Sequence, residues 1–288
     1  MDIEVRGREQ VADWVETALL VRGTRPLAYD ELERLAQDEI GTGSAQVALA
    51  TRALRRRADV LGAAYPFVVN DFALRARPDA RRSVYASLVL MSAGSVARAT
   101  MSTTAAREME VLFEQLAEQA LARVWGDVGR AVRFGWPSEV GRPQSFPAAI
   151  KWLADLLGVP AGTGYRPPIR KDGGVDVVAW RPFADGRSGF PVVLAQCTLQ
   201  AELISKASDV EPRVWASWLT MDVDPVTALV VPQTIADDRL WEQLALRGMV
   251  VERLRLAELC GQQEVVGAPA WNNEVLSRLE EHMSMVVQ

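Results

Sequence analysis

KDGGVDVVAWRPFADGRSGFPVVLAQC, from Lys171 to Cys197, is the stretch from which most of the predicted architecture follows. Two Val-rich segments, 174–180 and 190–197, alternate their side chains with a period of two, which is typical of β-strands. The loop between them contains Asp185-Gly186, a pair that favours a reversal of the chain. The stretch therefore predicts a β-hairpin.

Polar side chains lie near the open end of this predicted hairpin. Because side chains alternate along a strand, Asp176 shares a face with Val178, and Gln196 shares a face with Leu194. Antiparallel pairing can bring Asp176 and Gln196 side by side. A carboxylate, an amide oxygen and a backbone carbonyl make a hard oxygen site that suits Mg²⁺. A nearby lysine would orient a water molecule or neutralise charge on a phosphate.

Two further strands follow the hairpin and alternate with helices. The apolar runs 227–232 and 248–252 predict strands, and the segments 199–208 and 237–247 have helical patterns. A strand–helix–strand order implies parallel pairing between the strands. The predicted fold class is therefore α/β, with a central mixed sheet flanked by helices.

Before this sheet, apolar residues recur at the three-to-four spacing that is typical of helices. Helices are predicted over 28–40, 44–62, 81–94, 104–125 and 146–157, and a similar pattern predicts a last helix over 271–285. We expect an all-helical N-terminal domain over 1–105, a sheet-containing domain over 106–265 and a helical tail over 266–288.

Two motifs in the helical part allow more than one interpretation. The GTG at Gly41–Gly43 follows no convincing strand, so a turn between helices is favoured over a dinucleotide-binding loop. The run Arg55-Arg56-Arg57 could contact phosphate, although a solvated helix face is the more usual origin of such a run.

Composition excludes several classes of protein. With only Cys197 and Cys260, and His282 as the single His, we expect neither disulfides, Cys-based zinc sites nor His-based triads. No Lys follows a Gly, which excludes a Walker A loop. The net charge of −5 argues against non-specific coating of nucleic acid. No secretory signal is visible, and the longest uncharged run, 83–97, is shorter than the roughly 20 residues that span a bilayer, so a cytoplasmic location is expected.

Three pieces of the sequence together resemble a known family. FEQLAEQAL (113–121) on a predicted helix, DGGVDVVAW (172–180) and VVLAQC (192–197) are similar to the Mrr-like branch of the PD-(D/E)xK nucleases. The resemblance extends over about 106–260, a little over half of the chain. It implies a restriction-endonuclease-like core after the helical N-terminal domain.

The resemblance also implies the residues of the site. The metal-binding Asp of the family falls on Asp176, its Gln on Gln196, and the auxiliary Glu of its first helix on Glu114. The implied cofactor is Mg²⁺ or Mn²⁺. One position departs, because the lysine of the family would fall on residue 198, which is Thr198 here. Some bacterial relatives carry this lysine on the following helix, and Lys206 falls at that offset as a third catalytic candidate.

The function that the resemblance implies is that of a metal-dependent endonuclease. It would hydrolyse phosphodiester bonds in DNA, in restriction or anti-phage defence, while the N-terminal domain recognises a target or a partner protein. Cutting both strands usually needs two active sites, so a homodimer is expected, with no membrane association. The alternative is an inactive subunit that keeps the nuclease fold and acts as a scaffold for nucleic acid or protein. Thr198 and the net charge of −5 favour that alternative.

Each candidate residue also has an ordinary structural explanation. Asp176 can end the turn after the two glycines, and Gln196 can be a polar residue of an edge strand. Glu114 lies on a Glu-rich helix, and Lys206 can simply solvate the segment after the strand. Lys171 is expected in the loop, where contact with phosphate is the alternative role.

Overall fold

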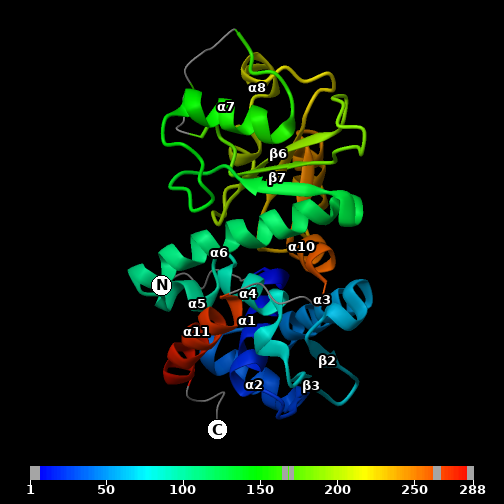
Figure 1. The fold of residues 1–288 in the computed structure, drawn as a ribbon. Helices are drawn as coiled ribbons and strands as arrows, with labels where there is room; N and C mark the ends of the chain where they lie inside the picture. The colour runs from blue at the N-terminus through cyan, green and yellow to red at the C-terminus, as the bar shows by residue number, and fades with distance from the viewer. Residues whose placement is uncertain (1–6, 164–167, 169–171, 262–266, 284–288) are drawn as a thin grey trace. The chain divides into compact units, whose positions relative to one another are not determined.

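The computed structural model describes residues 7–163, 168, 172–261 and 267–283 (Figure 1). Within these ranges the chain forms two compact units. Unit 1 contains the chain up to Leu112, the short segment Pro232–Ala236 and the chain from Arg253 onward. Unit 2 contains Phe113–Val231 and Asp237–Glu252. Lys171 lies outside the described residues.

Unit 1 consists mainly of helices. Its α-helices are α1 (Arg8–Arg22), α2 (Tyr29–Ile40), α3 (Ser44–Leu61), α4 (Val84–Met91), α5 (Val96–Thr100), the first part of α6 (Thr103–Ala122) up to Leu112, α10 (Arg253–Cys260) and α11 (Ala268–His282). The 3-10 helices η1 (Gly62–Ala64) and η2 (Ala80–Arg82) connect some of them. Every residue of α4 is buried, which explains why its sequence is apolar on all sides.

The expectation of an all-helical N-terminal domain is wrong. Three short strands, β1 (Leu27–Ala28), β2 (Phe67–Val69) and β3 (Ala73–Ala76), form an antiparallel sheet in the order β1-β3-β2. Strands of two to four residues are too short to show a period of two in the sequence. The available signal was Asn70-Asp71, a turn pair between two apolar segments.

The run Arg55-Arg56-Arg57 of α3 divides between two environments. Arg55 and Arg56 are exposed, and Arg55 forms an ion pair of 3.0 Å with Asp71. Arg57 is only 2 % exposed, and its Nη1 donates a hydrogen bond of 2.6 Å to Oε2 of Glu16. The spacing of α3 turns Arg57 toward the interior, so this residue is a structural one.

Arg57 and Glu16 belong to a buried ion network within unit 1. Arg253 binds both carboxylate oxygens of Asp13 at 2.7 Å. The hydroxyl groups of Tyr65 and Tyr85 donate to Oε1 of Glu16 at 2.7 and 2.9 Å. The predicted sheet-containing domain over 106–265 includes α10, but α10 belongs to unit 1. The network explains this, because Arg253, the first residue of α10, is fully buried against Asp13 of α1.

Unit 2 contains a five-stranded mixed sheet. Its strands are β4 (Arg130–Arg133), β5 (Val177–Trp180), β6 (Val192–Cys197), β7 (Val226–Val230) and β8 (Met249–Val251), in the order β4-β5-β6-β7-β8. β4, β5 and β6 pair antiparallel, whereas β6, β7 and β8 pair parallel. The predicted α/β class with a mixed sheet is confirmed. The edge strand β4 was missed, because its sequence RAVR has arginines at both ends.

Helices flank this sheet. They are the later part of α6 (Thr103–Ala122), then α7 (Phe146–Leu157), α8 (Pro212–Trp218) and α9 (Asp238–Ala245), with the 3-10 helices η3 (Arg123–Val128) and η4 (Lys206–Ser208). Figure 1 shows α7 and α8 on one side of the sheet and the later part of α6 on the other. Among the helices of the described ranges, none has both the length and the apolar character needed to cross a membrane.

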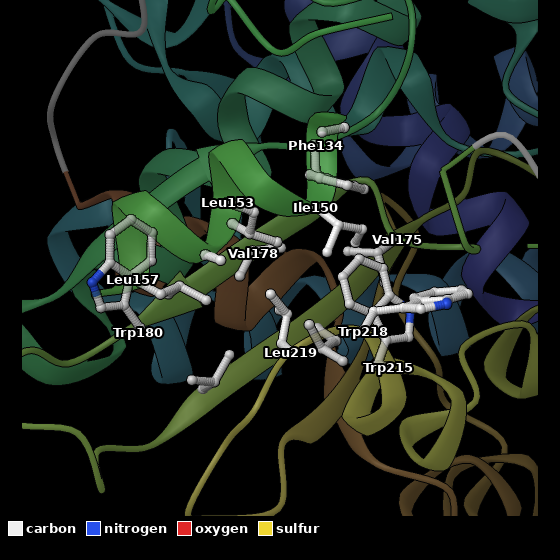
Figure 2. Packing of buried hydrophobic residues seen from close by; sticks show 14 of the residues in the cluster. Phe134, Ile150, Leu153, Leu157, Val175, Val178, Trp180, Trp215, Trp218 and Leu219 are labelled. Atoms are coloured by element: carbon white, nitrogen blue, oxygen red, sulfur yellow. The ribbon is translucent and has the colours of Figure 1, made fainter. Parts of the chain in front are cut away.

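The core of unit 2 lies between the sheet and helices α7 and α8 (Figure 2). Val178 of β5 and Leu194 of β6 are fully buried in it, as is Leu153 of α7. Trp215 and Trp218 of α8 pack edge to face, with ring centroids 5.2 Å apart. The apolar face of the hairpin is therefore covered by a packed layer of side chains.

Candidate functional site

The two glycines before Asp176 let the chain pass close to other backbone and ring atoms. Gly173 and Gly174 have φ angles of 65° and 78°, which favour glycine. The carbonyl of Gly173 accepts a hydrogen bond of 3.1 Å from Nε1 of Trp215. A Cβ on Gly174 would lie only 2.6 Å from the carbonyl oxygen of Asp209. Asp172 completes the turn, because its Oδ1 accepts from the Gly174 amide at 2.9 Å.

Asp176 lies where three backbone segments meet at the start of β5. Its amide donates to the carbonyl of Ala195 at 2.9 Å, and its carbonyl accepts from the amides of Phe134 (2.7 Å) and Gly135 (3.1 Å). Oδ2 of its side chain accepts from the Cys197 amide at 2.7 Å. The main chain and one carboxylate oxygen are thus fixed, while Oδ1 points toward Gly135.

The carboxylates of Glu114, on α6, and of Asp176 both lie close to Gly135. A Cβ on Gly135 would lie 3.5 Å from both carboxylate oxygens of Glu114 and 3.6 Å from Oδ1 of Asp176. Because Gly135 has no side chain, no atom of its own fills the space that these two carboxylates border. The structure therefore brings together Glu114 and Asp176, which lie 62 positions apart in a sequence where only the family resemblance connected them.

The surroundings of Asp176 change its acidity. Burial raises the pKa of the Asp176 carboxyl to about 8, the Cys197 amide opposes that rise, and the nearby carboxylates of Glu114 and Asp172 add to it. The ammonium of Lys206 lowers the same pKa. A cation bound beside a buried carboxyl stabilises the negative charge of the carboxylate and so lowers the pKa of that carboxyl.

Gln196 of β6 lies beside Ala195, to which Asp176 is hydrogen-bonded, but its side chain binds a different partner. The β5–β6 pairing ends at Val177–Ala195, and the amide of Asp176 donates to the carbonyl of the same Ala195. The Gln196 side chain is buried, and its Nε2 donates to Oδ2 of Asp209 at 2.9 Å. Its Oε1 is buried without a hydrogen-bond partner. An orphaned buried amide oxygen is a free acceptor for a cation or a donor.

The predicted helix over 199–208 is wrong, since only the short η4 forms there. Local side-chain hydrogen bonds replace the helical ones: Oγ1 of Thr198 accepts from the Gln200 amide at 3.2 Å. Oε1 of Glu202 accepts from the Ile204 amide at 3.1 Å, and its Oε2 from the Ser205 amide at 3.1 Å. Such bonds compete with helix formation.

Lys206 nevertheless returns to the neighbourhood of Gln196. Its Nζ lies 3.4 Å from Oδ2 of Asp209, the same oxygen that accepts from Gln196. Lys206, Asp209 and Gln196 thus form a chain of polar contacts beside the strand end. The direct contact of Lys206 is with Asp209, and its influence on Asp176 is electrostatic.

Thr198 fills the position where the family resemblance expects a lysine. Its side chain is 5 % exposed, and its amide donates to the carbonyl of Val230 at 3.0 Å. A hydroxyl at this buried position has no charge to offer a phosphate. Any cationic side chain of the site must therefore come from another segment, and Lys206 is the candidate that the structure brings near.

Sequence reasoning missed two residues of this site. Gly135 stands two positions after the end of the edge strand β4, and because that strand was not recognised, the glycine gave no signal. Asp209 lies 13 positions after Gln196, and it was hidden by the wrongly predicted helix. Within the described residues, no three His, Cys, Asp or Glu side chains form a group that could hold a metal ion. A metal site here would need the amide oxygen of Gln196 beside two carboxylates.

Searches among protein-family models, curated proteins and solved structures each gave no match to this chain.

Proposed function

We propose that this chain is a Mg²⁺-dependent endonuclease that hydrolyses phosphodiester bonds in DNA, built on a restriction-endonuclease-like core of the Mrr-like kind. The observation that carries the proposal is the approach of Glu114 and Asp176 around Gly135, at the end of the β5–β6 hairpin. The raised pKa of Asp176 supports it, since perturbed carboxyls are enriched at functional sites.

The donors present fit a hard divalent cation such as Mg²⁺ or Mn²⁺. Glu114 and Asp176 offer carboxylate oxygens, and Gln196 offers an Oε1 that has no hydrogen-bond partner. When bound, the metal would polarise a phosphoryl oxygen and lower the pKa of a water molecule. The chain's own part is to orient these oxygens, which the Cys197 amide does for Asp176 and Asp209 does for Gln196.

Lys206 is proposed as the cationic residue of the site. Its pairing with Asp209 holds its ammonium beside Gln196, from which it acts on the charge of Asp176. In that place it would stabilise negative charge on a phosphate or on an attacking water. Restriction or anti-phage defence remains the proposed setting, and a homodimer remains the proposed form for cutting both strands.

A second candidate is an inactive subunit that binds nucleic acid or protein. Two observations favour it: Thr198 replaces the family's lysine, and the amide of Gln196 is already bound to Asp209. An inactive descendant would keep the fold, which depends on the core between the sheet, α7 and α8, because none of the candidate ligands belongs to that core.

Cleavage by the purified chain separates the two candidates. We expect plasmid DNA to be cut with Mg²⁺ or Mn²⁺ and not with EDTA, and duplex RNA to survive. Asp176→Asn should lower the rate by at least about a hundredfold, because a directly bound ligand is lost. Glu114→Gln should lower it less, since water can replace an auxiliary ligand. Asp185→Asn, in an exposed loop, is the matched control.

Lys206 is tested in the same assay by two substitutions. Lys206→Arg can keep the ion pair with Asp209 but cannot readily exchange a proton, whereas Lys206→Met loses the charge altogether. Loss of activity in both variants supports proton exchange, and loss in Lys206→Met alone supports a purely electrostatic role. Two outcomes would contradict the nuclease proposal and favour the inactive subunit. One is equal cleavage by the wild type and Asp176→Asn, and the other is the absence of cleavage with every divalent metal tested.

A further inference from the structure

The first elements of unit 1 follow one another in the order α1, β1, α2, α3, β2, β3. α2 and α3 are joined by only three residues, Gly41 to Gly43. Gly41 has left-handed angles (φ 64°, ψ 30°), and the amides of Gly41 and Thr42 cap α2 by donating to the carbonyls of Gln37 and Ala36, each at 3.1 Å. Two helices on a short glycine turn form a helix-turn-helix, and here a β-hairpin follows it after the short 3-10 helix η1.

The second helix of this motif, α3, has one buried and one exposed face. Val47, Ala50 and Leu54 are at most 2 % exposed and pack into unit 1. The opposite face is exposed and carries small residues at its start and arginines further on. Its members recur at three-to-four spacing: Ala45, Ala48, Leu49, Arg52, Arg55 and Arg56. Small side chains at the start allow another surface to come close to the helix.

The β2–β3 hairpin presents a firmly held tip beside α3. Oδ1 of Asn70 accepts from the amides of Phe72 and Ala73, each at 2.9 Å, and the Tyr29 hydroxyl donates to the Asn70 carbonyl at 2.6 Å. The ion pair between Arg55 and Asp71, at 3.0 Å, joins the tip to α3. Phe72 at the tip is 86 % exposed. The tip therefore presents an exposed aromatic side chain next to the residue that is paired with α3.

We propose that this surface of unit 1 binds duplex DNA, with α3 in the major groove and the hairpin tip against the neighbouring backbone and minor groove. The major groove of B-DNA admits an α-helix, whereas the deep, narrow major groove of A-form RNA does not. Residues outside the nuclease candidates carry the inference, since Glu114, Asp176, Gln196 and Lys206 all belong to unit 2. The inference therefore goes beyond the proposed function and does not rest on it.

Charge favours DNA over a protein partner as the occupant. Arg52, Arg55 and Arg56 of α3 and Arg75 of β3 are exposed, and Asp59 and Asp71 are the exposed acids among residues 44–76. Four guanidinium groups against two carboxylates give the surface a positive balance in a chain whose net charge is −5. Arginines at this density match a row of phosphates, and an apolar tip can insert beside bases in the minor groove.

Binding is measured with the full chain in EDTA, so that cleavage plays no part. Fluorescence anisotropy follows a labelled duplex of about 20 base pairs, roughly two turns of B-DNA. Arg52→Ala combined with Arg56→Ala should weaken binding about tenfold or more and reduce the salt slope by about 1.8, which corresponds to two lost phosphate contacts. Alanine favours helix, so α3 should stay folded, and circular dichroism checks this.

The matched control removes two other arginines of unit 1, the exposed Arg8 and the half-buried Arg278. Arg8→Ala with Arg278→Ala removes the ion pairs with Glu9 and Glu274, while Glu9 keeps its pair with Arg57, and should leave DNA binding unchanged. Phe72→Ser should weaken binding several-fold without changing the salt slope. Full affinity in the double variant of α3, an equal loss in the control pair, or equal affinity for duplex RNA would overturn the proposal.

Two further outcomes keep this proposal separate from the nuclease. A chain that binds DNA through α3 but cuts nothing would support this inference while the nuclease proposal fails. A chain that cuts DNA yet binds it with full strength after loss of Arg52 and Arg56 would do the reverse. No binding of DNA at all would overturn the inference and leave the α3 surface to a protein partner.

Discussion

Asp176 is the residue whose chemistry the structure changes most clearly, and its raised pKa predicts a pH dependence of stability. Burial raises the pKa of the Asp176 carboxyl to about 8, well above the ordinary value of 3.8. Between these values the folded chain retains a proton that the unfolded chain has released, so the free energy of unfolding falls as the pH rises from about 4 to about 8. Asp176→Asn removes this titration and should be more stable than wild type above about pH 7, as urea unfolding at several pH values would measure.

Two further measurements test the raised pKa of Asp176: a control variant and the effect of Mg²⁺ on the melting temperature. Asp185→Asn changes an exposed loop carboxylate and should keep the wild-type pH dependence. At the proposed metal site Mg²⁺ and the proton would compete for Asp176, so Mg²⁺ should raise the melting temperature of the wild type more at about pH 8.5 than at about pH 6. Parallel pH curves for the wild type and Asp176→Asn would contradict the assigned pKa.

The element that positions Asp176 is the loop Asp172–Val175, and its glycines are tested by substitution. Gly186→Ala is strained by a φ of 68° but meets no atom within 4 Å, so it should cost about 1–2 kcal/mol of unfolding free energy. Gly174→Ala has a similar φ and would also press on the Asp209 carbonyl at 2.6 Å. It should cost at least about 1 kcal/mol more, measured by urea unfolding.

The difference in unfolding free energy between the two variants separates the effect of the close contact with Asp209 from the effect of the positive φ angle, which both glycines share. Equal losses in Gly174→Ala and Gly186→Ala would show that only the angle matters and that the approach to Asp209 carries no strain. A larger loss in Gly174→Ala should be accompanied by weaker Mg²⁺ stabilisation, because Asp209 also holds Gln196.

At the scale of the whole molecule, the buried ion network holds distant parts of the sequence in one unit. Glu16 of α1 accepts from Arg57 of α3 at 2.6 Å, and Arg253 of α10 lies 3.2 Å from the same carboxylate. Glu16→Ala leaves two buried guanidinium groups short of a partner and should cost about 3–5 kcal/mol. Glu274→Ala, which breaks an i,i+4 pair on the partly exposed face of α11, should change stability by less than about 0.5 kcal/mol.

Urea unfolding measures both variants of the network. Burial raises the pKa of Tyr65 and Tyr85, with Glu16 adding to the rise, so Glu16→Ala should also lower the pH at which these phenols ionise. Ultraviolet absorbance follows that ionisation. A small stability loss in Glu16→Ala, comparable with Glu274→Ala, would refute the structural role assigned to the network.

The local pattern of the sequence was sufficient for most of the regular elements of unit 2. The strands β5 to β8, the hairpin between β5 and β6, and the parallel crossover through α9 were all predicted within a few residues. They could be predicted because periodicity and turn residues act over neighbouring positions. The small sheet β1–β3 and the edge strand β4 could not, because strands of two to four residues depend on the partner that they pair with.

Of the candidate site, the sequence by itself determined that Asp176 and Gln196 lie near the open end of one hairpin, because the two strands and the turn between them follow from local pattern. Tertiary structure decided the rest: Glu114 reaches Asp176 across Gly135, and Asp209 takes the amide of Gln196. These contacts join residues from separate elements, and their distances depend on how the elements pack. Periodicity indicates which face of a helix or strand is apolar. Only the packing of the elements determines which polar groups of different elements come into contact.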